Sequence, residues 1–298
     1  MNKKTKKTLV GSPVKVKKTK IGETKIPTPE EQMQEQFQDM PKNDGVWQNR
    51  VLVFTPTTGL VRAEWVRARY GQVIPTNWSM VDMVQYLSSY MPIMYQLADA
   101  QNLMAKKVVE EDYQWVIYVE HDNVLPPDGF WKFNEYINEN KIPVVSGLYF
   151  TKSEPAEPIL YRGRGNSFYK DWKLGDKVWV DGIPFGFRLE NAKLIKEAWK
   201  TSPEYWVGNV LTRRVFESPS RVWWNEERQG FMSKVGTSDL AWCTRIMEEK
   251  LLEKAGFPEI QKLKYPFLVD TNIFVGHIDQ DGRQYPLKVP DRFLPTKK

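Results

Sequence analysis

The segment that most constrains the fold is residues 115–122, where an uninterrupted run of β-branched and aromatic residues ends in Glu120, His121 and Asp122. Such a run predicts a strand that is covered on both faces, as in parallel sheets, and these sheets bind ligands beyond the carboxyl ends of their strands. Alternate side chains of an extended chain point the same way, so Glu120 and Asp122 can share one hard cation such as Mg²⁺ or Mn²⁺. The alternative is a simple turn, opened by Asp122 and Asn123 before Pro126.

The composition is that of a folded protein with an uneven distribution of charge. The chain has 298 residues, of which 41% are hydrophobic and 13% aromatic, enough to bury the core of one large α/β domain or two small ones. Residues 1–25 hold nine lysines and one acidic residue, a net charge of +8, whereas the whole chain carries +6, so the remaining residues carry −2. The basic character therefore belongs to the first 25 residues, and the body of the chain is close to neutral.

The sequence favours a soluble protein in a reducing compartment. No stretch reaches the roughly 18 consecutive apolar residues of a membrane span, and the N-terminal lysines are not followed by the apolar segment of a secretion signal. Cys243 is the single cysteine, which excludes a disulfide within the chain and any zinc site built from several cysteines. We therefore expect a cytoplasmic protein.

Two parts are expected along the chain, an appendage at residues 1–45 and a folded domain at residues 46–298. Residues 1–25 have no sustained periodicity and predict a mobile basic tail, which serves either to contact an anionic partner or to solubilise the protein. A short polar helix is expected after Pro27 and should end near Met40.

The domain itself is expected to alternate strands and helices. A strand, turn and helix come first, then two helices, and next a strand, helix and strand that form a parallel crossover unit. Gln101 lies on the apolar face of the third helix, where its amide needs a partner in the backbone or in a ligand. After residue 150 the regular alternation stops. In chain order, the expected elements are strand 50–56, helix 60–70, helices 81–90 and 92–109, strand 115–119, helix 127–138, strand 142–149, short strands 158–161 and 177–180, a glycine-rich bend at 181–187, helices 191–199 and 238–253, and strand 269–275.

Further acidic and histidine residues stand at the ends of expected elements. Asp239 lies in the first turn of a helix and His277 just beyond a late strand, while Glu120 and Asp122 follow an earlier strand. An acidic residue in a first helical turn also favours the helix dipole, and an isolated histidine is commonly an ordinary loop residue, so each position keeps a structural interpretation. The chain has two histidines, His121 and His277, and both border these element ends.

In this order, the motifs of residues 50–280 resemble those of the GT-A glycosyltransferases, in particular the inverting family-two type that uses nucleotide-diphosphate sugars. Residues 50–57 are similar to the first strand and nucleotide-contacting turn of that family. Glu120-His121-Asp122 resembles its Asp-x-Asp motif, and Gly276-His277 resembles its C-terminal histidine. Three further segments carry the rest of the resemblance: Ala98–Asn102 for the alanine-arginine-asparagine helix, Asp181–Phe187 for the acceptor-side glycine-rich segment, and Thr237–Asp239 for the Glu-Asp pair.

The resemblance implies one α/β domain of GT-A type, with a mostly parallel central sheet flanked by helices, a Rossmann-like nucleotide-sugar-binding half and an acceptor-side half. It implies Asp239 as the general base that deprotonates an acceptor hydroxyl, with inversion at the anomeric centre. Asp122, Glu120 and His277 are the implied ligands of Mn²⁺ or Mg²⁺. The partners would be a nucleotide-diphosphate sugar and a carbohydrate or other hydroxyl acceptor. The implied contacts of the nucleotide sugar are Thr55, Pro56, Thr57, Gln101, Asn102, Glu120 and His121.

Departures from the family pattern leave other functions open. Gln101 stands where the family has an arginine, Glu120 takes the first position of the acidic motif, and Ser238 replaces a glutamate. These changes also suit a protein that keeps the scaffold to bind sugar nucleotides, or for a structural role, without turnover. A Mg²⁺-dependent nucleotidyltransferase or nucleic-acid enzyme, and a metal-free glycosidase with paired carboxylates, are the remaining alternatives. The tryptophans of residues 199–224 either belong to the core or stack on sugar rings.

Overall fold

The computed structural model describes residues 49–78, 90–163 and 168–295. The expected tail, the helix after Pro27 and all but the last residue of the helix at 81–90 lie outside these ranges. No helix of the described ranges combines the length and apolar character that crossing a membrane requires.

The helices are α2 (Ala63–Tyr70), α4 (Leu97–Glu110), α5 (Gly129–Glu139), α6 (Lys193–Thr201), α7 (Ser238–Glu248), α8 (Leu251–Lys254), α9 (Pro258–Gln261) and the 3-10 helix η1 (Asp291–Phe293). The strands are β1 (Val51–Phe54), β2 (Trp115–Val119), β3 (Asn123–Val124), β4 (Val144–Leu148), β5 (Lys177–Val180), β6 (Phe187–Asn191), β7 (Glu204–Val207), β8 (Val210–Arg213), β9 (Ser220–Asn225), β10 (Gly230–Val235), β11 (Phe267–Phe274), β12 (Gly276–Ile278) and β13 (Gln284–Tyr285).

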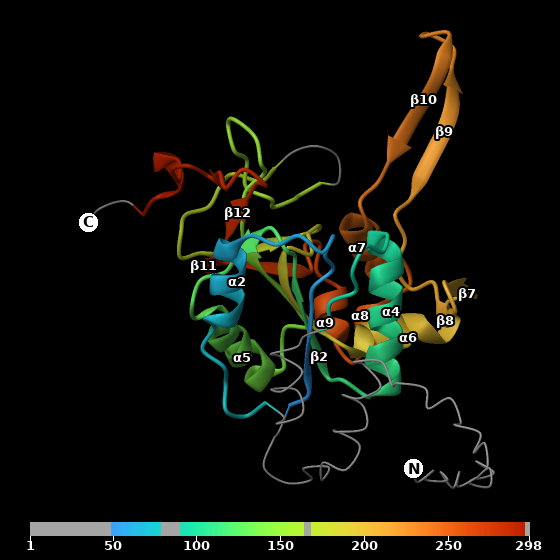
Figure 1. Cartoon of the computed structure of the whole chain (residues 1–298), viewed down its shortest axis with the longest axis horizontal. Helices are drawn as coiled ribbons and strands as arrows, with labels where there is room; N and C mark the ends of the chain where they lie inside the picture. The colour runs from blue at the N-terminus through green and yellow to red at the C-terminus, as the bar shows by residue number, and fades with distance from the viewer. Residues whose placement is uncertain (1–48, 79–89, 164–167, 296–298) are drawn as a thin grey trace, which may run out of the picture. The chain divides into compact units, whose positions relative to one another are not determined.

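A six-stranded sheet with the order β1-β2-β6-β4-β11-β5 lies at the centre of the described domain (Figure 1). Strands β1 and β2 are parallel, as are β4 and β11. Strand β6 runs antiparallel to both β2 and β4, and β5 runs antiparallel to β11. Four of the six strands therefore point the same way, which confirms the expected α/β class with a mostly parallel sheet flanked by helices.

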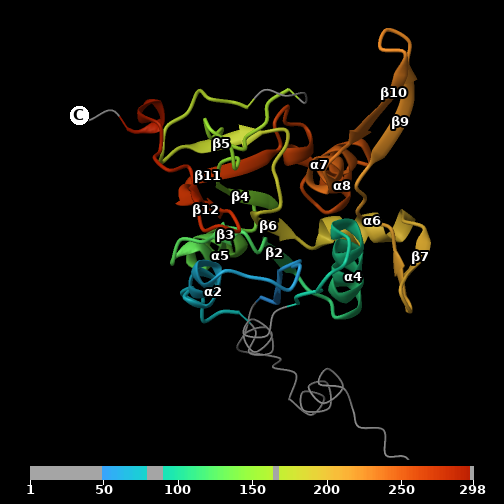
Figure 2. The same ribbon diagram turned by 45° about the horizontal axis from the view of Figure 1, so that its top comes forward.

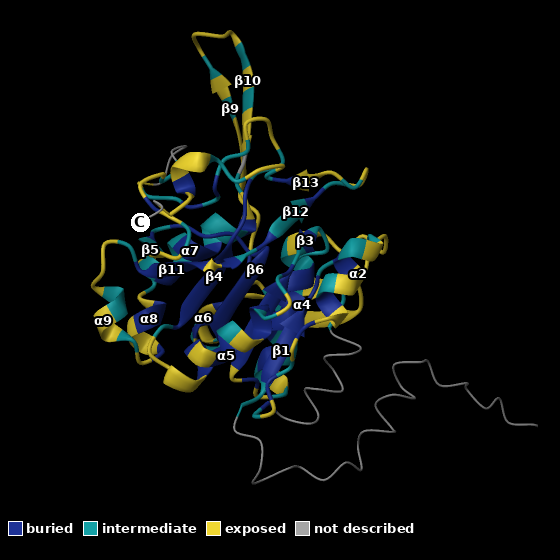
Figure 3. Cartoon of the chain, turned by 90° about the vertical axis from the view of Figure 1, so that its left-hand side faces the viewer, coloured by how far each residue is buried: buried dark blue, intermediate teal, exposed yellow. Residues whose placement is uncertain are grey.

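Helices cover both faces of this sheet, and this explains the uninterrupted apolar run in β2. Helices α2 and α5 lie on one face, and α4, α6, α7 and α8 lie on the other (Figure 1). Trp115, Ile117 and Val119 pack into the cluster that includes residues of α2 and α5. Val116 and Tyr118 pack into the cluster that includes residues of α4 and α6. Figure 3 shows the central strands as buried, while exposed residues lie on the outer helices. A strand covered on both faces needs apolar side chains at every position.

Strand β6 is the main element that the sequence analysis missed. A glycine-rich bend at 181–187 was expected to lead directly into a helix, whereas residues 187–191 form a central strand and α6 begins at Lys193. The expected crossover unit joins β2 to β4 through α5. These two strands point the same way, but they are not neighbours, because β6 lies between them. Charged residues are rarely fully buried unless paired, and β6 carries two of them, Arg188 and Glu190, which form a buried ion pair.

Most of the other predicted elements are present with shifted ends. Strand 115–119 has the predicted bounds. The helix expected from residue 92 begins only at Leu97, because the backbone of Thr57 bonds with Pro92 and Met94 and keeps this segment out of the helix.

Two later predictions were wrong in detail. The helix expected at 238–253 ends at Glu248, and the short helix α8 follows Lys250, which has a positive φ of 54°. Residues 158–161 take part in isolated bridges instead of a regular strand.

The tryptophan-rich region folds into two antiparallel hairpins, β7–β8 and β9–β10. Hairpin β9–β10 projects away from the sheet beside α7 (Figures 1 and 2). Trp224 pairs with Phe231 across this hairpin, with ring centroids 5.2 Å apart, and these residues are 44% and 76% exposed. Trp224 therefore does not belong to the core.

A small sheet of order β13-β12-β3 joins the C-terminal part of the chain to the segment after β2 (Figure 2). In the antiparallel register of β12 and β3, Gly276 lies opposite Val124 and His277 opposite Asn123. The amide of Ile278 donates a hydrogen bond to the carbonyl of Asp122 at 2.8 Å. This pairing brings His277 next to the acidic segment at the end of β2.

Candidate functional site

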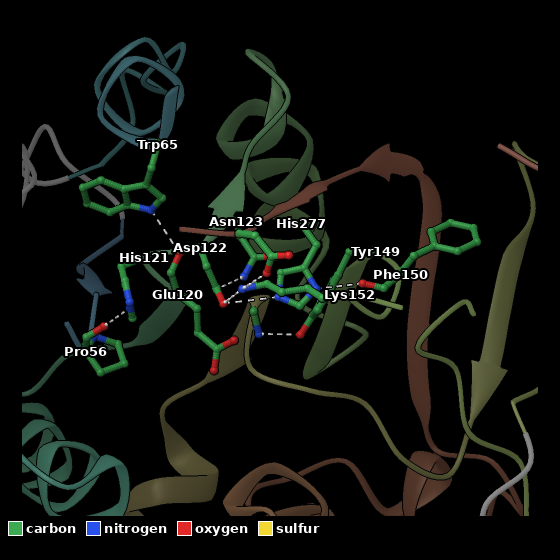
Figure 4. A network of polar contacts seen from close by, with 12 residues as sticks. Pro56, Trp65, Glu120, His121, Asp122, Asn123, Tyr149, Phe150, Lys152 and His277 are labelled. Carbon is green, nitrogen blue, oxygen red and sulfur yellow. Dashed lines mark hydrogen bonds and ion pairs between the residues drawn. The ribbon is translucent and has the colours of Figure 1, made fainter. Parts of the chain in front are cut away.

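The predicted acidic motif lies at the carboxyl end of β2, on an edge of the main sheet. Residues 120–122 form a turn between β2 and β3. The amide of Glu120 donates to the carbonyl of Gly186 at 2.9 Å, and Trp65 Nε1 donates to the carbonyl of Glu120 at 3.0 Å (Figure 4). The turn is therefore fixed between the start of β6 and helix α2.

Asp122 is held by side chains from three parts of the chain. Its Oδ2 atom lies 2.6 Å from Lys152 Nζ and 3.3 Å from His277 Nε2, and its Oδ1 atom accepts a hydrogen bond from Asn123 Nδ2 at 3.1 Å (Figure 4). Burial raises the pKa of this carboxyl group, but the hydrogen bonds and charges of His277 and Lys152 outweigh burial and lower the pKa below its ordinary value. Asp122 is therefore an anion at neutral pH.

His277 has the orientation of a histidine that can bind a cation through Nε2. Its Nδ1 atom lies 2.7 Å from the carbonyl oxygen of Phe150. A carbonyl oxygen only accepts hydrogen bonds, so Nδ1 carries a proton, and the other ring nitrogen, Nε2, faces Asp122 Oδ2. Histidines that bind metals are commonly oriented by such a bond from the other ring nitrogen. The two facing atoms, Asp122 Oδ2 and His277 Nε2, thus fit a divalent cation such as Mn²⁺ or Mg²⁺.

A third protein ligand is not in place beside this pair. Within the described residues, no group of three or more His, Cys, Asp or Glu side chains has the arrangement of a metal site. Figure 4 draws no hydrogen bond or ion pair to the carboxylate of Glu120, the third expected ligand. Burial, with smaller contributions from the charges of Asp122 and Asp239, raises the pKa of Glu120 to about 8. The other ligands of a cation would come from water or substrate phosphates, as is usual for Mg²⁺.

Asp239 lies in the first turn of α7, as predicted. Its Oδ1 atom accepts a hydrogen bond from the amide of Leu240 at 2.7 Å. Burial raises the pKa of Asp239, against the opposing effects of hydrogen bonds from neighbouring residues and of the Arg188 charge. A carboxylate with a raised pKa is a stronger base than one in water, and its proton affinity lies closer to that of a catalytic base at neutral pH.

Tyr149 is a buried neighbour of His277. Burial raises the pKa of its hydroxyl well above the ordinary value, and the charges of Glu120, Asp239 and Asp122 raise it further. Its ring packs edge-on against the ring of His277, with centroids 5.5 Å apart. Tyr149 is therefore neutral at neutral pH, and its ring lies beside His277, which faces Asp122.

Gly186 is required for the close packing behind this site. Its amide donates to Tyr149 Oη at 2.8 Å, and an added Cβ would overlap that hydroxyl and lie 2.9 Å from Asn123 Nδ2. We expect Gly186→Ala to displace Tyr149 and Asn123 and to lower the free energy of unfolding by about 1–3 kcal/mol, measured by urea denaturation. Gly230→Ala is the matched control, because the nearest atom to its added Cβ is 3.6 Å away. Equal stability of the two variants would contradict the packing argument.

The turn after β1 lies beside the turn after β2. The two strands are parallel, and His121 Nδ1 lies 3.3 Å from the carbonyl oxygen of Pro56 (Figure 4). Thr55 is fully buried, and its hydroxyl has no hydrogen-bond partner among the described residues. Thr57 Oγ1 accepts a hydrogen bond from the amide of Gly59 at 3.1 Å. The structure thus brings Pro56, Thr57 and His121 together at the sheet edge, while the side chain of Thr55 lies in the interior.

Gln101 and Asn102 of α4 differ in their environments. Asn102 Nδ2 donates to Tyr205 Oη at 2.8 Å and to the carbonyl of Phe216 at 2.9 Å, and Asn102 Oδ1 accepts from the amide of Phe216 at 2.7 Å. Asn102 therefore anchors the segment around β8. Gln101 is also fully buried, but its amide has no hydrogen-bond partner among the described residues. Such a group is costly to bury, and a water or ligand atom would lower that cost.

Lys152 and Tyr149 are site residues that the sequence analysis did not single out. Both follow β4, whose carboxyl end lies on the same edge of the sheet as that of β2. The sequence does contain a signal for Lys152, because it follows the strand predicted at 142–149 and ligands bind beyond the carboxyl ends of such strands.

Comparisons with known proteins place the chain near several solved structures at low similarity. No family model matches the chain, and no curated protein matches its sequence. A197 from STIV is similar with 14% sequence identity and a TM-score of 0.45, over 78% of this chain and 87% of that chain. S. aureus TarS 1–349 in complex with UDP-GlcNAc is similar with 12% identity and a TM-score of 0.33, over 52% of this chain and 49% of that chain. Both TM-scores lie below 0.5, so the function is argued below from the geometry of the site.

Proposed function

We propose that this protein is a glycosyltransferase of GT-A type that uses Mn²⁺ or Mg²⁺ to move a sugar from a nucleoside-diphosphate donor to an acceptor hydroxyl. The observation that supports this most is the meeting of Asp122 and His277, 155 positions apart, with His277 Nε2 turned towards Asp122 Oδ2 at 3.3 Å. Glu120 and Asp239 lie close enough for their charges to interact. The Asp122 carboxylate and the His277 ring nitrogen offer ligand atoms to a divalent cation, and a bound cation would attract a diphosphate.

In this proposal, each residue has a part that follows from its chemistry. Asp122 and His277 hold the cation, which supplies positive charge for the departing nucleoside diphosphate when it is bound. Asp239 accepts the proton of the acceptor hydroxyl while the hydroxyl oxygen bonds to the anomeric carbon. Attack from the face opposite the leaving diphosphate inverts the anomeric centre. The raised pKa of Asp239 supports its role as the base.

The donor nucleotide is proposed to lie along the turns after β1 and β2. The backbone of Thr55, the half-buried Pro56, the buried Thr57, and the side chains of Glu120 and His121 border this edge. Parallel strands of one sheet commonly bind nucleotides beyond their carboxyl ends. In α4, the unsatisfied amide of Gln101 offers a donor and an acceptor, and Asn102 positions the helix through its own bonds to the segment around β8.

A ligand screen tests the proposal. The protein is heated with Mn²⁺ and a panel of UDP-, GDP- and dTDP-sugars, with EDTA as the control, and release of the nucleoside diphosphate is then followed. A donor present at about 100 times its Kd should stabilise the fold by about 2.7 kcal/mol. Stabilisation that needs Mn²⁺ and is followed by nucleotide release supports a transferase. Stabilisation without release, with acceptors supplied, favours a non-catalytic binding protein, and no response to any sugar nucleotide contradicts the proposal.

Asp122→Ala is expected to abolish the Mn²⁺-dependent part of this stabilisation. The variant loses one of the two facing ligand atoms and leaves the positive charge of Lys152 without its partner at the same place. The measurement is a thermal-shift titration with MnCl₂. Asp112→Ala is the matched control, because Asp112 is an 89% exposed carboxylate paired with Lys196 on the surface. Wild-type Mn²⁺ stabilisation in Asp122→Ala would exclude Asp122 as a ligand.

A further inference from the structure

The ammonium group of Lys152 lies where a cation bound by Asp122 would lie. Its Nζ atom lies 2.6 Å from Asp122 Oδ2 and 3.7 Å from Asp279 Oδ1. The side chains of Lys152 and Asp122 are 26% and 29% exposed, so solvent screens their interaction only in part. The ion pair joins the segment after β4 to the turn after β2, and Asp279 follows β12. Three segments that are distant in sequence therefore build this cation position.

The same oxygen of Asp122 has two neighbours, and this creates a competition. Asp122 Oδ2 faces both Lys152 Nζ and His277 Nε2. A divalent cation between Asp122 Oδ2 and His277 Nε2 would bind this oxygen at about 2.0–2.6 Å, within the reach of the ammonium group. The bound cation and the ammonium group would then both lie next to Asp122 Oδ2. Two positive charges so close together repel each other strongly in a partly buried site. Lys152 therefore has to leave Asp122 when the cation binds.

The chemistry of lysine suits such an exchange. A lysine carries a compact charge with three donors on a flexible stem, whereas an arginine would hold a carboxylate with a rigid bidentate fork. Lysine is also a common partner of phosphate oxygens. Asp279, whose Oδ1 atom lies 3.7 Å from Lys152 Nζ, is a second anion towards which the ammonium group can move.

We propose that Lys152 is the resident counter-ion of Asp122, which a divalent cation displaces and which then binds the anionic oxygens of the donor diphosphate. The inference rests on the proposed function, because it takes a diphosphate as the ligand. It assigns Lys152 two parts: it opposes cation binding in the nucleotide-free protein and favours diphosphate binding once the cation is present.

The first test measures Mn²⁺ binding without any nucleotide, by electron paramagnetic resonance of the free ion. Lys152→Met is expected to bind Mn²⁺ about tenfold more tightly than the wild type, because the competing charge is gone. Adding Asp122→Asn to this variant should remove the gain. Lys196→Met is the matched control, since Lys196 is 25% exposed and also pairs with an aspartate, Asp112, from another part of the chain. Unchanged or weaker Mn²⁺ binding by Lys152→Met overturns the inference.

The second test measures binding of UDP, GDP or dTDP in the presence of Mn²⁺ by isothermal titration calorimetry. We expect Lys152→Met to lower the affinity for the nucleotide that the wild type binds by about tenfold, because one charge-assisted contact is lost. Unchanged nucleotide affinity overturns the diphosphate part. If the wild type binds none of the three nucleotides, the proposed function fails, while the Mn²⁺ titration still decides whether Lys152 is a counter-ion. The fold of each variant is checked against the wild type by circular dichroism. If Lys152→Met does not fold, Lys152→Gln takes its place in both tests.

Discussion

Asp239→Asn is expected to lower the rate of sugar transfer by about 100- to 10,000-fold, the usual contribution of a positioned general base. The amide of asparagine cannot take the proton of the acceptor hydroxyl at neutral pH. Its oxygen can still accept the hydrogen bond that the Leu240 amide donates to Asp239 at 2.7 Å, so the first turn of α7 should persist. The measurement is release of the nucleoside diphosphate at saturating donor and acceptor, beside a circular-dichroism spectrum.

The matched control for this variant is Asp112→Asn, which makes the same chemical change at an 89% exposed position. It should retain the wild-type rate. An Asp239→Asn variant that binds the donor as the wild type does but has lost transfer supports a role in the chemical step. Wild-type turnover in Asp239→Asn would exclude Asp239 as the base.

Arg188→Met is expected to lower the free energy of unfolding by about 3–5 kcal/mol, the cost of leaving one partner of a buried ion pair without its counter-charge. The side chains of Arg188 and Glu190 form an ion pair in the central strand β6, and both are inaccessible to solvent. Trp242 Nε1 also donates to Glu190 Oε1 at 3.0 Å, but a neutral donor cannot replace the guanidinium charge. Denaturation by guanidinium chloride at neutral pH measures the loss.

Two variants separate the loss of the buried charge from a general effect of the substitution. Arg188→Met combined with Glu190→Met removes both charges and should recover most of the lost stability. Lys200→Met breaks a surface pair with Glu197, in which the lysine is 65% exposed, and should change stability by no more than about 1 kcal/mol. A loss in Arg188→Met as small as that in Lys200→Met would show that the buried pair has little effect on stability.

The loss in Arg188→Met should also depend on pH. Burial already raises the pKa of Glu190 from its ordinary value of 4.5, against the opposing charge of Arg188. Without Arg188 the pKa of the folded variant rises further, so above about pH 4.5 the folded state binds a proton that the unfolded chain has released. Stability then falls as the pH rises through that range. We expect a larger loss at about pH 8 than at about pH 5, and equal losses would contradict protonation of Glu190 in the variant.

Parts of the fold and site could be predicted because their signals are local. The strand at 115–119 has the predicted bounds, since an apolar run without alternation is the direct result of helices on both faces of a sheet. The residues Asp122, Asp239 and His277 were singled out because each follows or begins an element. The structure brings Asp122 and His277 together beside Tyr149, since the segments after the strands of one sheet share an edge.

The sequence does not show how a residue is used where its use depends on neighbours in space. Asn102 is expected to contact a nucleotide, and in the structure its side chain bonds with Tyr205 and Phe216, more than 100 positions away. The ammonium group of Lys152 makes a 2.6 Å contact to Asp122. The sequence places Lys152 after a predicted strand, but the partners of Lys152 and Asn102 depend on how distant segments pack.

By itself, the amino-acid sequence determined the α/β class, the apolar strands of the sheet and the acidic residues at its edge. These features follow from side-chain periodicity and from residues next to one another in the chain. Only the tertiary structure decided that β6 enters the sheet between β2 and β4, because the charges of Arg188 and Glu190 can be buried in a strand only after each has found the other. It also decided the register that sets His277 opposite Asn123, and so the contact between His277 and Asp122, since strand pairing across 154 positions is selected by the packing of the whole domain.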